Sequence, residues 1–575
     1  MQIRHLKVRN FRGIASLDWT TGQSFCCLIG AGDSGKSTVL DAIEAVLSSR
    51  WFSFSEPDFL ACDTTRSITI EATIGELSKA LKSDERFGLY IRGWTSSGTL
   101  RDEPEADDEP VLTVRLTVDA TMEPAWEVVC DRTSDTRNLS NRDRALFSLV
   151  RLAGEDARHL TWGQGSVLSR LTGDAKEAST VLADAYRTAR TSAKLDEIKS
   201  LTDAARLAEG FAKGLGAYVQ GAYGPGLELG RSGLSSGSIA LHDAGVPLRL
   251  AGLGTRRLAT LAIQKSAITE GAIVLVDEIE HGLEPHRIIG AISQLKADQD
   301  KARSTDKPIG QVLMTTHSDV ALGEIAAESL RVVQMHVPTR QTSIRQPGSP
   351  DPIRPLLRFT PRALFSRRIL VCEGNTEIGM LLGLRENWPD RHNGKPIEQM
   401  GAAIADGNGA QASSIALALS HLGYEVAILR DSDVPLPPDI IVKLNIARIV
   451  VIEYGNLLNS EQAIFFPCTD ELVQELLTHV RSELGNDAVD NNIQNRVGDL
   501  TIDDIRSPFS TWHTKSLSTP ADLRAHIAHV AAQKKWFKSQ HAGRSVAHIV
   551  WKIAGAAPES PLTKCILSVE GWLYA

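Results

Sequence analysis

The chain has 575 residues, and because a single hydrophobic core stops growing at roughly 250–300 residues, several domains are expected. A composition of 42% hydrophobic and 23% charged residues excludes wholesale disorder and fibrous repeats. The net charge of −8 excludes a cationic nucleic-acid coat, although a local basic groove stays compatible with it. Seven scattered cysteines favour neither a disulfide scaffold nor a structural zinc site, and no stretch approaches the roughly 18 apolar residues of a membrane span. We expect a cytoplasmic protein.

The first distinctive motif is a glycine-rich loop between a strand and a helix. Strand-like FCCLIG is followed by GAGDSGKST and the amphipathic run TVLDAIEAVLSSR. Residues 30–37 fit GxxxxGK[ST], in which backbone N–H groups bind the β-phosphate, Lys36 neutralises phosphate charge and Ser37 ligates Mg²⁺. The predicted ATP-binding residues here are Gly30, Gly32, Asp33, Ser34, Gly35, Lys36, Ser37 and Thr38.

An acidic strand end supplies the second half of an ATP site. Five apolar residues, 272–276, precede Asp277 and Glu278. Asp277 would hold Mg²⁺ and Glu278 would polarise the attacking water. A strand that ends in Asp-Glu is by itself usually structural, but the lysine loop makes the functional interpretation stronger. The long separation between the two motifs favours an ABC/SMC arrangement with a helical insertion over a minimal RecA-type core.

Two further segments agree with an ABC-type ATPase. His317, in MTTHS after a strand, is predicted to reach the γ-phosphate. The segment AGLGTRR before a helix, with Gly252 and Gly254, is a candidate signature loop, although it departs from LSGGQ. Helix N-termini favour phosphate, so such a loop would cap ATP bound to another chain. We therefore expect a homodimer or a higher homo-oligomer.

Pattern changes along the chain indicate an α/β fold in several parts. Residues 66–130 are rich in predicted strands, residues 141–216 in helical spacing, and residues 366–480 alternate short strands and helices as in a parallel sheet. The predicted organisation is an ATPase head of residues 1–140 and 217–340, a dimerising helical insertion at 141–216, a linker at 341–365, a second α/β domain at 366–480 and a helical region at 481–575.

Acidic residues end two strands of the second α/β domain. Glu373 follows RRILVC, and Asp431 and Asp433 follow EVAILR. Because the carboxyl ends of parallel strands meet in one crevice, these three side chains are expected to converge. Carboxylates held together repel unless a cation is present, so the pattern predicts a Mg²⁺ or Mn²⁺ site. The alternative is that both segments are ordinary strand-ending turns.

The motifs together resemble a known family. EG followed by DxD resembles a TOPRIM domain, the metal-binding module of topoisomerases, primases and some nucleases. An ABC-type ATPase that opens with VRNFRGI and precedes a TOPRIM domain resembles the OLD (overcoming lysogenization defect) family of ATP-dependent nucleases, which includes the Gabija-type defence nuclease. The resemblance covers essentially the whole chain in motif order, through GAGDSGKST, VLVDEIEHGLEPH, TTHS, VCEGNTE and LRDSD.

The resemblance implies roles for particular residues. Glu373, Asp431 and Asp433 would be catalytic and would bind metal, with Glu377 and Glu461 as further acidic ligands. Gln462 follows Glu461 where the family usually has another acid. A late catalytic lysine of the family is matched best by Lys538 in KKWFK, and an ordinary solvated helix face is the alternative interpretation of these lysines.

The favoured function is metal-dependent cleavage of DNA, gated by ATP. Basic residues that could guide DNA are Arg354, Arg358, Arg362, Arg367, Arg368, the run 534–538 and Arg544. Two alternatives are a topoisomerase or primase, and an ATP-switched scaffold or sensor without nuclease activity. The resemblance also implies antiphage defence, either alone or with a helicase-like partner or a reverse transcriptase and its RNA.

Overall fold

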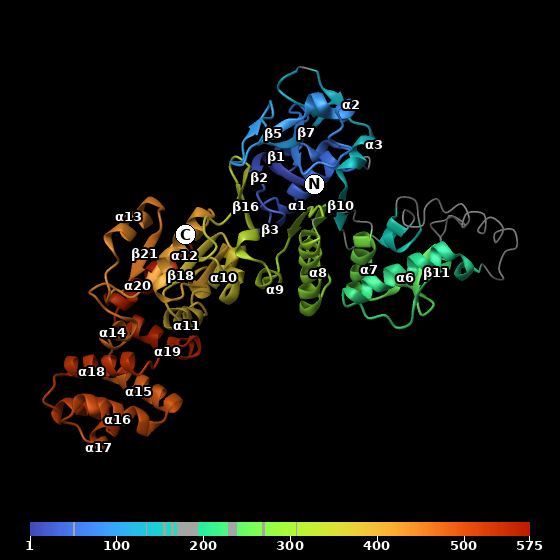
Figure 1. Cartoon of the computed structure of the whole chain (residues 1–575). Coiled ribbons are helices and arrows are strands. Elements are labelled where there is room, and N and C mark those ends of the chain that lie inside the picture. Colours follow the sequence, from blue (N-terminus) through green and yellow to red (C-terminus); the bar gives the residue numbers. More distant parts are fainter. Residues whose placement is uncertain are drawn as a thin grey trace. The chain divides into compact units, whose positions relative to one another are not determined.

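The computed structural model describes residues 1–49, 52–133, 135–152, 157–162, 166–168, 194–227, 239–266, 271–305 and 307–575. These form two compact units, Met1–Ile344 and Arg345–Ala575 (Figure 1). Each unit has its own buried hydrophobic core. No helix in the described ranges is both long and apolar enough to cross a membrane.

Unit 1 is built on a 14-stranded mixed sheet. The parallel part has the order β10-β14-β15-β3-β16. All residues of β3, β14 and β15 are buried, as expected for parallel strands covered on both faces. These elements are β3 Phe25–Ile29, β10 Leu149–Leu152, β14 Ile273–Val276, β15 Gln311–Thr315, β16 Leu330–His336, α1 Lys36–Leu47, α7 Leu253–Ser266, α8 Pro285–Ser304 and α9 Asp319–Gly323.

The remaining strands continue the same sheet, mostly in antiparallel pairs. The order is β17-β2-β1-β4-β7-β5-β6, with β8 and β9 beyond β7. Alternation of buried and partly exposed side chains along β1 and β7 shows that one face covers the core. The strands are β1 Gln2–Phe11, β2 Ile14–Thr20, β4 Ile68–Gly75, β5 Arg92–Trp94, β6 Leu100–Arg101, β7 Glu109–Val118, β8 Pro124–Val129, β9 Arg137–Asn138 and β17 Gln341–Arg345.

The segment 141–216 differs from the continuous helical insertion expected from the sequence. Its residues 149–152 form β10, which pairs in parallel with β14 at the edge of the unit 1 sheet. The long helix is α6, Lys199–Gly214, beside a small sheet of β11 Tyr223–Leu227, β12 Ile239–Asp243 and β13 Val246–Pro247. Residues 169–193 lie outside the described residues, so the predicted dimerisation role stays a prediction.

Unit 2 begins inside the predicted linker, most of which is folded. Residues 354–359 form α10, and residues 361–365 form a 3₁₀ turn whose Leu364 carbonyl accepts a 2.7 Å hydrogen bond from Tyr424. Prolines stand in the first turn of both helices, where a missing N–H costs little. Pro355 and Pro361 therefore help to start these two helices.

A four-stranded parallel sheet forms the centre of unit 2, in the order β19-β18-β20-β21. Helices from the C-terminal region share one hydrophobic core with this sheet, so they are not a separate domain. The elements are β18 Arg368–Cys372, β19 Ala402–Asp406, β20 Glu425–Arg430, β21 Val450–Glu453, α11 Asn375–Leu384, α12 Ala412–His421, α13 Pro438–Ile446, α14 Ser460–Phe465, α15 Asp470–Leu484, α16 Asn486–Val497, α17 Ile502–Arg506, α18 Pro520–Gln533, α19 Gln540–Ala556 and α20 Pro561–Leu573.

Candidate functional site

The loop after β3 has the geometry of a phosphate cradle. Gly30 and Gly35 have positive φ, and a Cβ on Gly30 would overlap the carbonyl of Val333. Lys36 is buried, and its Nζ donates to the carbonyls of Gly30 at 3.2 Å and Ala31 at 2.9 Å. Burial lowers the pKa of Lys36 to about 8, despite acidic neighbours. A bound phosphate would therefore give the Lys36 ammonium a fully negative partner in place of these neutral carbonyls.

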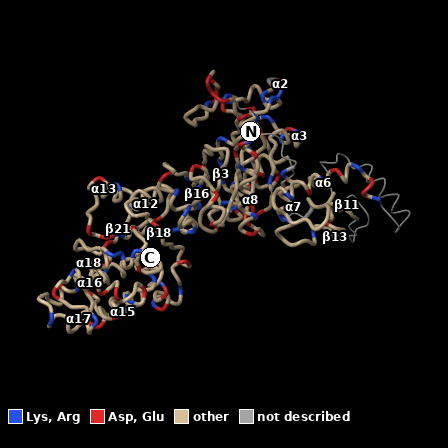
Figure 2. The backbone as a smooth tube through the Cα atoms, turned by 60° about the horizontal axis from the view of Figure 1, so that its bottom comes forward, with Lys and Arg blue, Asp and Glu red and all other residues tan. Residues whose placement is uncertain are grey.

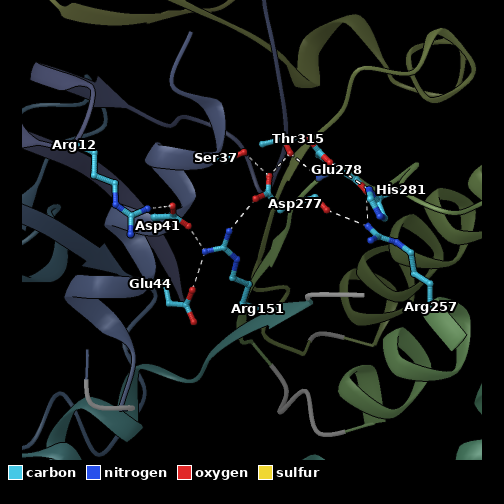
Figure 3. Close-up of polar contacts among 10 residues, drawn as sticks. All are labelled: Arg12, Ser37, Asp41, Glu44, Arg151, Arg257, Asp277, Glu278, His281 and Thr315. Carbon is cyan, nitrogen blue, oxygen red and sulfur yellow. Dashed lines mark hydrogen bonds and ion pairs between the residues drawn. The ribbon is translucent and has the colours of Figure 1, made fainter. Parts of the chain in front are cut away.

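Asp277 lies beside this loop, as the sequence predicts. Its Oδ1 accepts hydrogen bonds from Ser37 at 3.0 Å and Thr315 at 2.6 Å, and its Oδ2 lies 2.9 Å from an Nη of Arg151 (Figure 3). Ser37 and Asp277 are the two predicted Mg²⁺-site residues, and parallel strand order brings them together across the chain.

Arg151 is a residue that the sequence analysis missed. It stands on β10 and also pairs with Asp41 and, at 2.8 Å, with Glu44 on α1 (Figure 3). Burial alone would lower the pKa of Arg151, but these carboxylates raise it above its ordinary value. Its segment was interpreted as helical, which hid the pairing with β14. Arg12, from the VRNFRGI motif, contacts the same Asp41.

Glu278 and His317, both predicted to act near the γ-phosphate, follow the strands β14 and β15 of the parallel sheet. Glu278 has a φ of 45°, and its backbone N–H donates to the Thr315 hydroxyl at 2.8 Å. Its side chain is about half exposed and lies 3.6 Å from His281. Burial and then the charge of Lys36 lower the pKa of His317. His317 is therefore largely neutral at neutral pH.

The candidate signature segment lies at the start of α7. The Gly252 carbonyl accepts the N–H of Arg256 at 3.0 Å, so Gly252 immediately precedes the helix. A Cβ on Gly254 would lie 2.9 Å from the Gly282 carbonyl oxygen, which requires glycine at this close approach. A hollow of about 450 Å³ separates this turn from residues 282–284. The position suits a signature loop; contact with ATP of a second chain stays a prediction.

We expect different defects from two ATPase variants. Lys36→Ala removes the cation that faces the phosphates and should abolish nucleotide binding. Glu278→Gln keeps the cradle and should bind ATP while hydrolysing it at least about 100-fold more slowly. Fluorescent-nucleotide titration and phosphate release measure the two steps. Unchanged hydrolysis in Glu278→Gln would rule out its assigned role.

Unit 2 contains the second site at the ends of β18 and β20. Glu373 follows β18, and its N–H donates to the Leu429 carbonyl of β20 at 2.8 Å. Asp431 and Asp433 follow β20 directly. Two buried carboxylates come from helix starts: Glu377 from the first turn of α11 and Glu461 from the first turn of α14. The predicted acidic residues therefore occupy one neighbourhood of unit 2, reached from four separate segments.

Ser460 is a residue of this site that sequence reasoning did not single out. Its Oγ makes a short hydrogen bond with Glu377 and lies 2.8 Å from Oδ1 of Asp431. A capping box between Asn459 and Gln462 fixes the start of α14 and thereby the position of Ser460. The Ser460 hydroxyl has one proton and can donate it to only one of the two carboxylates. Its short contact with the other carboxylate favours a proton on that carboxylate.

The donor set fits a divalent cation. Both carboxylate oxygens of Glu461 and one of Glu373 are buried and make no hydrogen bond within the described structure. Buried carboxylate oxygens without hydrogen bonds are costly, and Mg²⁺ prefers carboxylate oxygens as ligands. In the described ranges no three acidic, histidine or cysteine side chains already enclose an ion position. The side chains of Glu373 and Glu461 would therefore have to turn toward a bound ion.

Burial and mutual repulsion shift the protonation of the site. Burial, and then the nearby Glu377, raise the pKa of Asp431 to about 7. Burial also raises the pKa of Glu373 and of Glu461. Burial alone would lower the pKa of Lys538, but the carboxylates, Glu461 first, raise it. Lys538 is thus a firmly charged cation, 4.0 Å from Glu461.

A second cation, Arg430, lies beside Glu373. Its Nε is 3.7 Å from Glu373 and its Nη1 is 3.0 Å from Glu453. Ser432, between the two site aspartates, is buried and bonds the carbonyls of Gly455 and Leu458. Arg430 therefore compensates charge at Glu373, while Ser432 holds the loop that carries Asp433.

The basic residues proposed for DNA contact are only partly available. Arg354, Arg368 and Arg544 pair with Asp351, Glu425 and Glu386 at 2.8, 2.8 and 2.6 Å. Positive and negative residues are interspersed along the tube of unit 2 in Figure 2. These pairs weaken the predicted basic surface, although exposed pairs exchange readily in water.

A glycine seam fixes the segment that carries Lys538. Helices α11 and α19 pack through Gly379 and Gly383 on one side and Gly543 on the other. A Cβ on Gly383 would overlap the Cβ of Ala547, and one on Gly543 would lie 2.6 Å from the Thr376 carbonyl oxygen. Thr376 also donates to the Phe537 carbonyl at 3.0 Å. The seam therefore sets the distance between the carboxylates and Lys538.

Metal binding should depend on pH near neutrality. Metal ligation needs the Asp431 carboxylate, so Mg²⁺ or Mn²⁺ affinity should fall as the pH drops below about 7. Because the folded-state pKa of Asp431 is raised, metal-free protein should lose stability as the pH rises from about 4 to about 7. Calorimetric titration with Mn²⁺ and melting in EDTA test both statements. A pH-independent affinity from pH 6 to pH 8 would contradict them.

The glycine seam gives a prediction with an internal rescue. Gly383→Ala forces α19 away, which should cost ~1–3 kcal/mol and, by displacing Lys538, lower the metal-dependent cleavage expected of this site. Adding Ala547→Gly removes the overlap and should restore much of the turnover. Gly555→Ala is the matched control, because Gly555 lies on α19 and has open space around it. Equal turnover in Gly383→Ala and Gly555→Ala would show that the seam does not position Lys538.

Comparisons with known proteins agree with this division. Residues 1–91 match the family model "AAA ATPase domain", residues 194–323 match "AAA domain, putative AbiEii toxin, Type IV TA system", and residues 364–433 match "Overcoming lysogenization defect protein-like, TOPRIM domain". No curated protein matches the chain.

Solved structures similar to the chain include three SMC head domains. One is an SmcHead bound to the C-winged helix domain of ScpA, at 15% identity and a TM-score of 0.36, covering 60% of this chain and 97% of that one. The head domain from Pyrococcus furiosus, bound to the C-terminal domain of ScpA, has 14% identity, coverage of 60% and 95%, and a TM-score of 0.35. That from Thermotoga maritima has 16% identity, coverage of 60% and 99%, and a TM-score of 0.28.

The fold and the family matches define an AAA ATPase domain and a TOPRIM domain in one chain. These matches to AAA ATPase models and to the OLD-like TOPRIM model confirm the resemblance to the OLD family found in the motifs of the chain. These domains imply the use of a nucleotide and a divalent metal. A closer likeness to the Gabija-type nuclease stays a prediction.

Proposed function

We propose that the chain is an ATP-regulated, metal-dependent DNA endonuclease. The observation that carries this proposal is the set of buried carboxylate oxygens without hydrogen bonds on Glu373 and Glu461, beside Asp431 and the charged Lys538. Carboxylate oxygens buried without hydrogen bonds are unfavourable on their own, and metal cations bound together with a phosphodiester would supply partners for them.

The residues have distinct roles in the proposed reaction. Two Mg²⁺ ions, when bound, supply an activated water and stabilise the leaving oxygen of an in-line displacement. The residues that would hold those ions are Glu373, Glu377, Asp431, Asp433 and Glu461. Lys538 stabilises the extra negative charge on the scissile phosphate, because its pKa keeps the ammonium protonated.

ATP would regulate cleavage through assembly of the ATPase heads. Gly252 and Gly254 at the start of α7 would complete the ATP site of a second copy, so that binding favours one arrangement of a two-state interface. Antiphage defence, and work with a helicase-like protein or with a reverse transcriptase and its RNA, belong to the same proposal.

The structure of the C-terminal residues bears on the topoisomerase alternative. Tyr574 stacks on His392 at 3.6 Å between ring centroids, and its hydroxyl donates to the Lys395 carbonyl at 2.8 Å. A topoisomerase needs a tyrosine nucleophile directed at DNA, and this hydroxyl is already engaged. The arrangement favours the nuclease over the topoisomerase.

Two variants separate the nuclease from a scaffold. Asp431→Ala should lower Mg²⁺- or Mn²⁺-dependent plasmid cleavage by at least about 100-fold while ATP binding stays intact. Lys538→Ala should lower turnover without weakening metal binding, because its role is toward phosphate. Cleavage is measured with purified protein, with and without ATP.

The control variant is Asp487→Asn, which alters an exposed carboxylate on α16 that pairs only with Arg506 among its described neighbours. It should cleave like wild type. Equal cleavage by wild type and Asp431→Ala would place the activity elsewhere. No cleavage by wild type under any nucleotide condition would favour the scaffold.

A further inference from the structure

The edge of the unit 2 sheet carries an unusual concentration of exposed apolar side chains. Of the 20 large hydrophobic residues exposed in the described structure, seven fall within residues 434–457. Isolated exposed apolar residues are ordinary, whereas a contiguous patch usually marks an interface. We call it the β21 edge surface; it consists of Val434, Ile441, Val442, Ile446, Val450, Val451 and Leu457.

This surface combines an open strand with a hollow beside it. β21 is the last strand of its sheet, and no backbone hydrogen bond joins it to a described residue outside β20. A cavity of about 430 Å³ lies between β21, α13 and the loops that follow β20 and β21. Its apolar lining includes Leu444 and Val451. An open edge of this kind accepts another strand, because unpaired N–H and C=O groups need partners.

The charges at the two ends of β21 select the partner. Arg448 precedes the strand and is exposed, while Glu453 ends it. Glu453 pairs with Arg430 of its own chain at 3.0 Å, and in antiparallel pairing with a second β21 the exposed Arg448 of each copy comes near that pair in the other. The only charges on α13, Asp439 and Lys443, pair with each other at 3.1 Å. The surface is therefore complementary to itself in charge as well as in its apolar character.

We propose that two copies of this chain associate through the β21 edge surface, by antiparallel pairing of β21 about a two-fold axis. A two-fold interface uses the same patch twice, which fits a patch without unbalanced charge. The two four-stranded sheets become one continuous sheet, and Val450 and Val451 are removed from water. This interface lies in the nuclease unit and is separate from the ATPase-head contact.

Mass measurement tests the proposal directly. Ile446 is 78% exposed, so Ile446→Glu should leave the fold intact while placing charge in the interface. Light scattering of nucleotide-free protein at micromolar concentration should show half the wild-type mass. Leu517→Glu, at a 98% exposed position outside the surface, should keep the wild-type mass, and thermal melting should match for both. Arg448→Glu provides a second disrupting variant if Ile446→Glu does not fold.

Cross-linking locates the axis. In a Cys62→Ser background the remaining described cysteines are buried, so a new cysteine at 450 or 451 is the reactive one. Directly opposed Cβ atoms lie about 4.5–5.5 Å apart, within reach of a short bis-maleimide. At least one of Val450→Cys and Val451→Cys should give covalent dimers, and Leu517→Cys should not. Equal masses for wild type, Ile446→Glu and Arg448→Glu, or equal cross-linking at 451, 450 and 517, would overturn the proposal whether or not the chain is a nuclease.

Discussion

Unit 2 depends on one constraint, which is that several carboxylates lie close together in a partly buried space. Parallel strands bring Glu373 and Asp431 to one edge, and two helix starts add Glu377 and Glu461. Without a cation the fold responds by raising carboxylate pKa values, by sharing the Ser460 hydroxyl and by placing Lys538 nearby. Each of these responses still allows a metal ion to replace the protons on the carboxylates.

In unit 1 the negative charge of the site carboxylate is balanced in a different way. Asp277 is held by two hydroxyl groups and by Arg151, so its charge is balanced before nucleotide arrives. The guanidinium also joins β10 to α1 through Glu44. The ATPase site is thus pre-formed by side chains of the chain itself, whereas the metal site of unit 2 awaits a ligand.

Short motifs were predictable because their chemistry fixes residue types in sequence. The lysine loop, Asp277, Glu373 and Asp431 all follow apolar strands and could be found from that context. Arg151 could not, because four residues give too little periodicity to distinguish a strand from a helix, and its partners come from distant segments. Ser460 was hidden similarly: a serine in a capping box is ordinary until folding brings two carboxylates to it.

The strand order of unit 1 also governs when its active site can exist. β3, which leads into the phosphate loop, lies between β15 and β16, so its neighbours are synthesised about 280–300 residues later. A nascent chain that ends before residue 330 lacks one flank of β3, and one that ends before 311 lacks both. Such non-local pairing folds slowly and leaves strand edges open meanwhile. During translation the nucleotide site therefore forms late. Bound nucleotide cannot stabilise the segment that carries Lys36 while that segment first folds.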